Sequence, residues 1–506
     1  MKIVYIDIDT LRPDHLGCYG YHRNTSPHID AVAKEAVRFD ACFVPDAPCL
    51  PSRSALHHGR FGIHNGALNH GGTFADPYPE GPGRAFGNTY AYKKFVQVLK
   101  QAGSYNALVS SFAGRHDSWW YLAGFHEVYD CGKGGMEIQT EVTPTALGML
   151  DRLKGKKDFY LHFNIWDPHT PYRTPADYGN PFTGDPVAPW ITQDRIDRDY
   201  GNFGQHCAAS RLTDWPSEDY YKNYPRVVRE IKTLADYKRH IDGYDTGIRF
   251  ADEAVGKVVA HLKKLGIYDE TAIIISSDHG ENQGELGIYG DHQTADLITN
   301  RVPMIVKWPG LKPRVDAGLH YQFDLTATVV ELLGMRVPEK WDAVGFKDAF
   351  LAGREAGRES LVISNSAWSS MRAVIWGENI LIKTYRDPVR EFPEHLLFNR
   401  NTDPHELADL APSMPERVHE GLARLQGWVD EQILKSDRKE DPFMRVIEEG
   451  GAYHLRGRLD RVVEHYEKLG RPDLVERIKA RYKPGSGYWA ADWRETGFLN
   501  RPMQGM

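Results

Sequence analysis

The sequence is poor in cysteine, and the cysteines it has are widely separated. Five are spread along a chain of 506 residues, and no two are spaced as Cys-x-x-Cys. An odd number of scattered cysteines does not suit a framework of disulfide bonds. A cysteine with a special role in this chain is therefore expected to act through its reactivity rather than as a cross-link.

Three further features are missing. The chain lacks the unbroken apolar run of about 18 residues that a membrane-spanning helix needs. Its net charge of -7 gives no reason to expect a basic surface for nucleic acid or an anionic membrane. It begins MKIVYIDIDT, where apolar and acidic residues alternate without the basic and apolar regions of a signal peptide. We therefore expect a cytoplasmic protein with neither a membrane nor nucleic acid as a partner.

The apolar segments that are present predict an α/β fold. Residues 3–8, 158–164 and 271–276 are rich in β-branched or aromatic residues, which is typical of buried strands. Between the last two, apolar residues from Ile241 to Leu262 step by three and four, which predicts a long helix with one buried face. Strands that alternate with helices favour a mostly parallel sheet covered on both faces.

The length of the chain implies two or three domains. Residues 1–368 are predicted to form a large α/β domain. From 369 to 436 the pattern changes to short strands at hairpin spacing and a helix, which predicts a smaller antiparallel sheet domain. Residues 437–506 form a charged, aromatic-rich tail with helical stretches and no repeat. The sequence assigns no role to this tail. If the protein forms a homo-oligomer, we expect the contact to lie in the tail.

Polar clusters follow three of the predicted strands. Asp9 comes after the first strand, Asp167 and His169 follow another, and Asp278 and His279 follow a third. In parallel sheets, functional residues lie in loops just past the carboxyl ends of the strands. We therefore expect these clusters to form one site.

The most informative segment is Cys49-Leu50-Pro51-Ser52-Arg53. On chemistry alone, a thiol near an arginine could be an activated thiolate, although a lone cysteine in a loop is more often a buried structural residue. The pattern Cys-x-Pro-Ser-Arg resembles the signature of type I sulfatases, in the alkaline phosphatase superfamily, at all four fixed positions. This resemblance implies that a formylglycine-generating enzyme oxidises Cys49 to formylglycine, and that Arg53 takes part in catalysis.

Two acidic segments resemble the metal-binding segments of that family. Asp9 matches its first metal aspartate, whereas Thr10 stands where many members have a second one, so that this ligand is missing or weakened. Asp278 and His279 match the second segment. With the formylglycine at Cys49, these residues imply a metal site whose oxygen donors favour Ca²⁺, while the imidazole would also suit Mn²⁺.

Two loops resemble family segments that contact the sulfate. His169 matches a sulfate-contacting histidine. Arg115 and His116 lie where many members have Gly-Lys-x-His, with one residue fewer, and which of the two takes which role stays open. For His116 a plain surface-loop role is an equally good interpretation.

Three more residues are candidate substrate contacts. His292 lies where many members have a lysine, nine residues before Arg301, and would replace a fixed positive charge by one that depends on pH. Asn69 and His70 follow the cysteine segment and could bind substrate, but ordinary loop positions would explain them as well.

The resemblance covers about residues 3–425. It implies an alkaline-phosphatase-like α/β sandwich with a smaller C-terminal antiparallel sheet domain, in which residues 1–368 form the catalytic domain. It also implies that a hydroxyl of the hydrated aldehyde attacks sulfur while the metal and Arg53 offset the growing charge. His169 and His292 are the candidates for the acid that protonates the leaving alcohol.

Three other interpretations stay open. A phosphonate monoester or phosphodiester hydrolase would share the fold, the metal and the formylglycine. A chain in which Cys49 is never oxidised would bind substrate without turnover. A plain thiol hydrolase would need a histidine poised on Cys49 and no metal.

The substrate is expected to be a small sulfate ester, because a cytoplasmic enzyme does not meet long sulfated polymers. Either a sulfated mono- or oligosaccharide or an aryl sulfate would fit. Aromatic rings suit sugar faces and aryl groups alike, and four lie near the expected site: Trp119, Trp120, Trp166 and Tyr172. Because Arg115, Asn69 and His70 could bind hydroxyl groups, we favour a carbohydrate.

Overall fold

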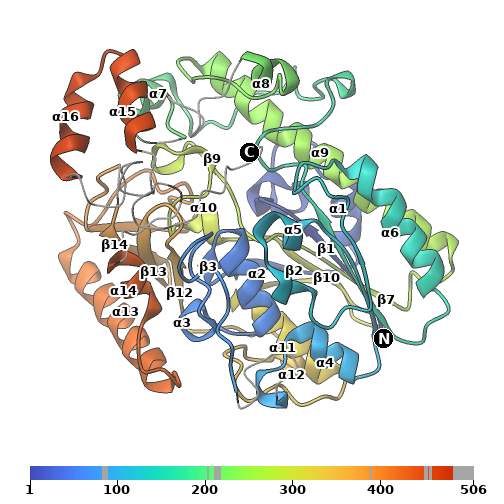
Figure 1. Ribbon diagram of the computed structural model, residues 1–506. Coiled ribbons are helices and arrows are strands. Elements are labelled where there is room, and N and C mark those ends of the chain that lie inside the picture. The colour runs from blue at the N-terminus through green and yellow to red at the C-terminus, as the bar shows by residue number, and fades with distance from the viewer. Residues whose placement is uncertain are drawn as a thin grey trace.

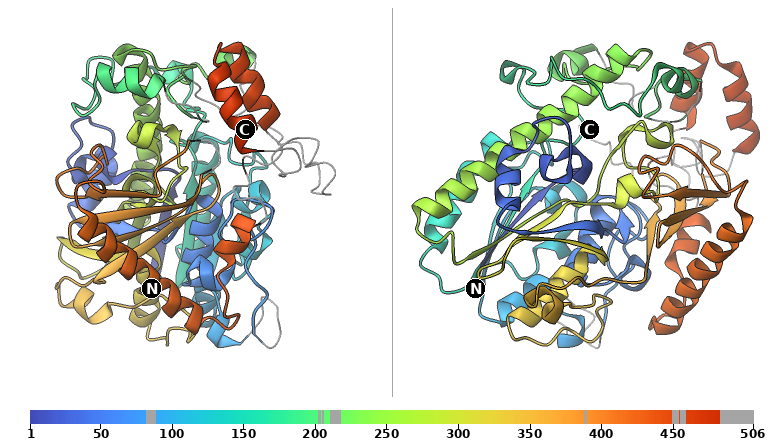
Figure 2. Two further views of the ribbon diagram at one scale, coloured as in Figure 1. Left: turned by 90° about the vertical axis from the view of Figure 1, so that its left-hand side faces the viewer. Right: turned by 180° about the vertical axis from the view of Figure 1, so that it is seen from behind.

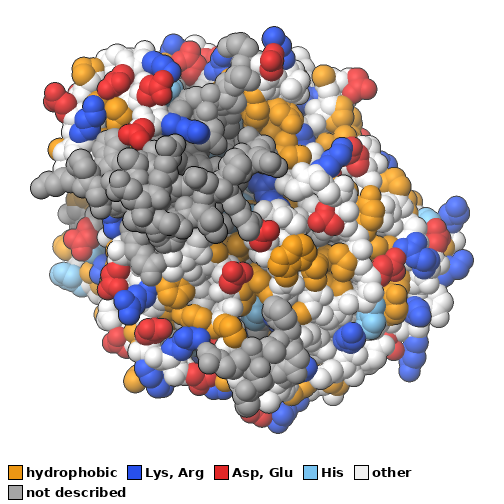
Figure 3. Space-filling view, in the orientation of Figure 1, with side chains coloured by type: hydrophobic (Ala, Val, Ile, Leu, Met, Phe, Trp, Pro, Cys, Tyr) orange, Lys and Arg blue, Asp and Glu red, His pale blue; other side chains and the backbone are white. Residues whose placement is uncertain are grey.

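The computed structural model describes the chain apart from residues 82–88, 202, 203, 205, 210–217, 388, 389, 449–453, 455–458 and 483–506. A large sheet lies between layers of helices, and a smaller sheet lies beside it (Figure 1). On the face seen in Figure 3, the described acidic and basic side chains are interspersed.

The large sheet has eight strands, and β10 alone among them runs antiparallel to its neighbours. Their order is β11 (Arg314–Tyr321), β2 (Val37–Phe43), β10 (Met304–Lys307), β7 (Thr271–Ser276), β1 (Lys2–Ile8), β6 (Phe159–Ile165), β4 (Tyr105–Val109) and β5 (Glu127–Tyr129). The prediction of an α/β fold with a mostly parallel central sheet is confirmed.

Both faces of this sheet are buried, because successive side chains of a strand point to opposite sides. In β1, Ile3 and Tyr5 join one apolar core, while Val4, Ile6 and Ile8 join another. The first core is closed by α2 (Cys49–His58), α4 (Phe95–Gln101) and α11 (Gln322–Leu332), and the second by α1 (Pro27–Ala33), α6 (Gln139–Leu153) and α9 (Leu234–Lys264). These two helix layers lie on opposite sides of the sheet in Figure 1.

The small sheet joins distant parts of the chain. Its order is β15 (His395–Asn399), β14 (Asn379–Arg386), β13 (Ser370–Trp376), β12 (Ser360–Asn365) and β3 (Asp46–Ala47), and α13 (Pro415–Lys435) packs against it. The pairs from β15 to β12 are antiparallel, whereas β3 runs parallel to β12. The division at residues 368 and 369 stays a prediction, and this sheet takes strands from both sides of it.

The tail packs against its own chain. It contains α14 (Pro442–Glu448), α15 (Leu459–Lys468) and α16 (Pro472–Arg481). In both views of Figure 2, α15 and α16 lie side by side, and their apolar residues form a small core with Ala367 and Trp368. The homo-oligomer contact assigned to this segment stays a prediction.

The remaining elements are short. They are α3 (Gly62–Asn65), α5 (Phe112–His116), α7 (Gln193–Tyr200), α8 (Glu218–Asn223), α10 (Leu297–Asn300), α12 (Lys347–Leu351), β8 (Asn282–Gln283) and β9 (Tyr289–Asp291). Within the described ranges, no helix combines the length and the apolar character needed to cross a membrane.

A buried ion pair ties the loop after β1 to the loops after β7. Arg12 is 1% exposed, and its guanidinium lies 2.9 Å from Oε1 of the fully buried Glu285. Burial opposes ionisation of Glu285, but Arg12 and His405 hold the pKa of that carboxyl below its usual range. The pair therefore stabilises the fold above the ordinary carboxyl pKa, and this contribution is lost as the pH falls.

We expect Arg12→Met to lower the free energy of unfolding by about 3–5 kcal/mol near neutral pH, since it leaves a buried carboxylate without its cation. The loss should shrink in acid, where Glu285 becomes protonated. Denaturant titrations at both pH values measure it. The control is Arg417→Met, which breaks an exposed pair with Glu420 and should leave the free energy of unfolding almost unchanged. Equal losses in the two variants would contradict the account of this ion pair.

Candidate active site

Cys49 lies in a helix rather than in the loop expected from its sequence. It is the first residue of α2 and is fully buried. The pairing of β3 with β12 fixes the chain just before it. Because the first N–H groups of a helix have no partner within the helix, its amino end favours negative charge. Position 49 is therefore suited to a group that contacts an anion.

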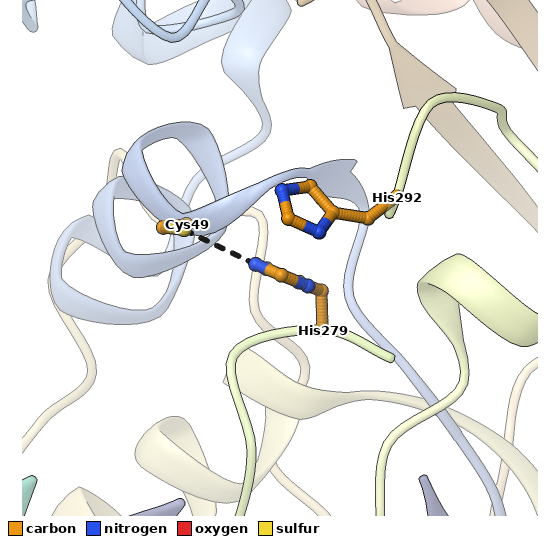
Figure 4. A group of neighbouring side chains, drawn as sticks. All are labelled: Cys49, His279 and His292. Carbon is orange, nitrogen blue, oxygen red and sulfur yellow. Dashed lines mark hydrogen bonds between the residues drawn. The ribbon is translucent and has the colours of Figure 1, made fainter. Parts of the chain in front are cut away.

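A histidine lies next to the Cys49 thiol. Nε2 of His279 is 3.1 Å from Sγ. Figure 4 marks this contact with a dashed line. Nδ1 of His279 lies 2.8 Å from the carbonyl oxygen of Gly280, to which it can only donate. In the neutral ring, Nε2 then keeps its lone pair and points it towards the thiol. That lone pair is available to a cation or a proton.

Three carboxylates share the buried guanidinium of Arg53. Arg53 lies 3.0 Å from Oδ2 of Asp7 and 3.1 Å from Oδ2 of Asp9, and it also donates to Asp278. One positive charge therefore faces three carboxylates in a site closed to solvent. Arg53 contacts the carboxylates directly and so holds them in place.

The donor set fits a divalent cation. Asp9, Cys49, Asp278 and His279 each offer one ligand atom, and these atoms all lie within 4.8 Å of one another. Oδ1 of Asp9 is buried without a hydrogen-bond partner among the described residues. Because a buried polar atom normally has a partner, this oxygen marks a place for a ligand. A dipositive ion would also offset the negative charge of the carboxylates, which the single positive charge of Arg53 does not balance.

Burial and the crowding of carboxylates change the ionisation of these groups. Burial raises the pKa of Asp9 well above its usual range, with a further contribution from Asp278. Burial opposes ionisation of Asp278, but Arg53 and His279 lower its pKa to about 2. Burial, together with Asp9 and Asp278, also raises the pKa of the Cys49 thiol. A histidine is poised on Cys49, as a thiol hydrolase would need, but the thiolate itself is disfavoured.

Thr10 stands where many members of the family that the sequence resembles have a second metal aspartate, and its part in a metal site stays a prediction. Its backbone N–H donates to Oδ1 of Asp278 at 3.2 Å, and its side-chain oxygen is buried without a hydrogen-bond partner among the described residues. Its φ is 57°, a left-handed conformation that β-branched residues rarely adopt. The amide of Thr10 thus positions a carboxylate, at a cost in backbone strain.

His169 and His292 lie on the His279 side of the site. The ring centroid of His292 is 4.2 Å from that of His279 and 6.0 Å from that of His169. Burial and His279 lower the pKa of His292 to about 3. Burial and Arg115 lower the pKa of His169. In the free protein His292 is therefore neutral near pH 7, whereas the lysine that the family resemblance implies at this position would be charged.

The other candidate contacts lie on a second side of Cys49. A ring nitrogen of His70 and one of His116 lie within 4.8 Å of Sγ and of each other. Several polar atoms here are buried without a hydrogen-bond partner among the described residues: Nδ2 of Asn69, Nε2 of His70, Nε2 of His116 and Nε of Arg115. A bound polar ligand would satisfy such atoms.

The four aromatic residues expected near the site have different surroundings. Trp120 is 3% exposed, and Tyr172 is packed against His240 and Tyr244 of α9. Trp166 is 1% exposed and lies under the guanidinium groups of Arg53 and Arg115. Trp119 is 62% exposed. Three of the rings therefore pack within the protein, and Trp119 alone of the four has a large free surface.

Two residues of this site were not identified from the sequence. His454, from the tail, has its Nε2 2.7 Å from Nδ1 of His70, and Trp368 stacks on His454. A single histidine in a charged tail carries no local pattern. The signal that could have identified Trp368 is its place just after β12, because functional residues often follow the carboxyl ends of strands.

Comparison with known proteins identifies a family. The family model described as Sulfatase matches residues 2–335. An N-acetylglucosamine-6-O-sulfatase of Bacteroides thetaiotaomicron is 22% identical over 405 residues, which cover 68% of this chain and 70% of the relative. An N-acetylgalactosamine-6-O-sulfatase of the same species is 24% identical, over 83% of this chain and 91% of the relative.

Solved structures share the fold. One is a protein in complex with its substrate D-glucosamine-2-N,6-O-disulfate. That protein aligns with a TM-score of 0.67 at 16% identity, and the alignment covers 87% of this chain and 99% of the other. Another is a phosphonate monoester hydrolase from Silicibacter pomeroyi, with a TM-score of 0.63 at 17% identity and a coverage of 87% and 96%.

Proposed function

Because the chain belongs to the sulfatase family and is a sulfuric ester hydrolase, we propose that it hydrolyses a sulfated mono- or oligosaccharide with a formylglycine made from Cys49 and a divalent metal ion. The observation that carries this proposal is the position of Cys49. It stands at the amino end of α2, beside two carboxylates and a histidine with the geometry of a cation site.

The metal ligands in this proposal are Asp9, Asp278, His279 and the residue at position 49. Two carboxylates and an oxygen at position 49 suit Ca²⁺, and the imidazole makes Mn²⁺ the alternative. A bound cation would act as a Lewis acid towards the sulfuryl oxygens. Arg53 keeps the carboxylates fixed, and the amide of Thr10 holds Asp278.

Formylglycine, as its hydrate, supplies a hydroxyl nucleophile for sulfur, and a formylglycine-generating enzyme is the partner that must act on Cys49. His169 and His292 are the proposed proton donors to the leaving alcohol. Both are neutral in the free protein, but a nearby sulfate ester carries the negative charge that favours the imidazolium form. Arg115 and His116 are the proposed further contacts to the ester, and a ring nitrogen of His116 lies within 4.8 Å of Sγ of Cys49.

A carbohydrate is the favoured substrate class for two reasons. The named activities of the two relatives described above are on sulfated amino sugars. In this chain, one buried nitrogen each of Asn69 (Nδ2), His70 (Nε2) and Arg115 (Nε) has no hydrogen-bond partner among the described residues, and these nitrogens suit the hydroxyl groups of a sugar. We also propose that the substrate is small and that the protein is cytoplasmic.

The test is a set of esters offered to aldehyde-bearing enzyme. We expect kcat/KM for the best sulfated sugar to exceed that for a matched aryl phosphonate monoester by at least about 100-fold, and chelator to abolish both rates. A faster phosphonate reaction would favour the phosphonate hydrolase alternative. Turnover that survives chelator would favour a thiol hydrolase, and aryl sulfates that far outpace every sugar would remove the carbohydrate assignment.

A further inference from the structure

Among the residues that the structure describes, the tail reaches the site through His454. His454 lies between α14 and α15, and only 5% of it is exposed. Its ring is stacked on Trp368 with centroids 4.7 Å apart and an interplanar angle of 21°. Its backbone N–H donates to the carbonyl oxygen of Ala367 at 3.3 Å. His454 itself is thereby held against the residues that follow β12.

The tail is also fastened on both sides of His454. Before it, Asp441 pairs with the buried Arg372 of β13, at 2.8 Å between Oδ1 and Nη2. After it, α15 and α16 bury their apolar residues against Ala367 and Trp368. A residue held in this way has a defined position in the site.

His454 also contacts His70, which lies beside position 49. Nε2 of His454 and Nδ1 of His70 are 2.7 Å apart, so one of these nitrogens donates a hydrogen to the other. Nε2 of His70 is buried and has no described partner, which leaves it for a ligand. The direction of the hydrogen bond therefore decides what Nε2 of His70 can offer.

The oxygens of a sulfate ester are acceptors only. A neutral His70 can donate to them from Nε2 only if its Nδ1 carries no hydrogen, and Nδ1 must then accept a hydrogen bond from a donor. The one partner shown for Nδ1 is Nε2 of His454. With the hydrogen on Nε2 of His454, both requirements are met.

We propose that His454 is a positioning residue, which holds His70 in the tautomer that donates from Nε2 to a sulfate ester bound at position 49. The C-terminal tail, which lies outside the residues matched by the family model, thus completes the substrate site. This inference rests on the proposed function, because it takes a sulfate ester as the ligand.

Two substitutions separate the hydrogen bond from packing. His454→Phe keeps a ring that can stack on Trp368 but removes the N–H donor. His454→Gln removes the ring and keeps an amide N–H at a similar distance from the backbone. We expect His454→Phe to lower kcat/KM for the best sulfate ester by about 10- to 100-fold, and His454→Gln to restore it to within about threefold of wild type.

The double variant and a distant control complete the kinetic test. His70→Phe should lower kcat/KM by a similar factor. Adding His454→Phe to it should lower kcat/KM no further, because both changes break the same hydrogen-bonded pair. His419→Phe changes an exposed histidine on α13 and should leave kcat/KM unchanged. Three results would each show that His454 only packs. They are a kcat/KM of His454→Phe within about twofold of wild type, a kcat/KM of His454→Gln as low as that of His454→Phe, and full additivity of the losses in the double variant.

A second readout does not depend on activity. The imidazole nitrogen chemical shifts of His70, assigned by their absence in His70→Phe, report which ring nitrogen carries the hydrogen. We expect the Nε2–H tautomer in wild type and in His454→Gln, and a shift towards Nδ1–H in His454→Phe. The same tautomer in all three would overturn the inference, whereas failure to hydrolyse any sulfate ester would overturn the proposed function instead.

Discussion

Cys49→Ala is expected to remove sulfate ester turnover by at least about 10⁴-fold, because alanine cannot supply the nucleophile. The fold should survive. Cys49 is the first residue of α2, where alanine is well tolerated, and the change removes a single sulfur atom. Initial rates on the best sulfated sugar, measured with the melting temperature of the same preparation, give both results.

The matched control is Cys42→Ala, which removes a sulfur from an equally buried position in β2. It should lower the melting temperature by a few degrees, as a small cavity does, while leaving the rate within about twofold of wild type. A Cys49→Ala protein that retains more than about a hundredth of the wild-type rate would contradict the assigned nucleophile.

Asp9→Asn and Asp278→Asn are expected to lose bound metal and activity together. Each keeps the shape of the side chain but removes one of the two anionic ligands, so that affinity for Ca²⁺ should fall by at least about 100-fold. Elemental analysis of the purified proteins measures occupancy. In addition, Ca²⁺ at about 100 times its Kd should stabilise wild type by nearly 3 kcal/mol and leave both variants unchanged.

Asp7→Asn is the control for this experiment. Asp7 contacts the same guanidinium, with Oδ2 3.0 Å from Arg53, but contributes no atom to the group of ligands around Cys49. Its metal content should therefore stay close to that of wild type. Full occupancy in both Asp9→Asn and Asp278→Asn would place the metal elsewhere.

The fold could be predicted from the sequence where local patterns are strong. Residues 3–8 and 271–276 form β1 and β7 because their apolar, β-branched side chains fill the two cores that a sheet covered on both faces provides. The polar residues that follow these strands, Asp9 and Asp278, then come together at one edge of the sheet. Element boundaries were less accurate, since the helix expected from Ile241 to Leu262 begins earlier, at Leu234, and ends at Lys264.

Contacts between distant segments could not be predicted. A strand of two residues, β3, has no pattern of its own, yet its pairing with β12 fixes the chain before Cys49. Trp120 and Tyr172, two of the four aromatic residues expected near the site, are buried, because aromatic rings near a site fill the core as readily as they bind ligands. That one of the four rings stacks on the substrate stays a prediction. The contact of His454 with His70 depends on the packing of the whole tail, which a single sequence does not reveal.

In the proposed mechanism, Cys49 becomes the aldehyde whose hydrate attacks the ester. The mass of the peptide that contains residue 49, measured on the same samples as the rate, tests it most directly. We expect a fraction of the peptide to be lighter than the thiol form by about 18 Da, and kcat across preparations to rise in proportion to that fraction. A preparation in which residue 49 is entirely thiol, yet which hydrolyses the sulfated sugar at the full rate, would contradict the account.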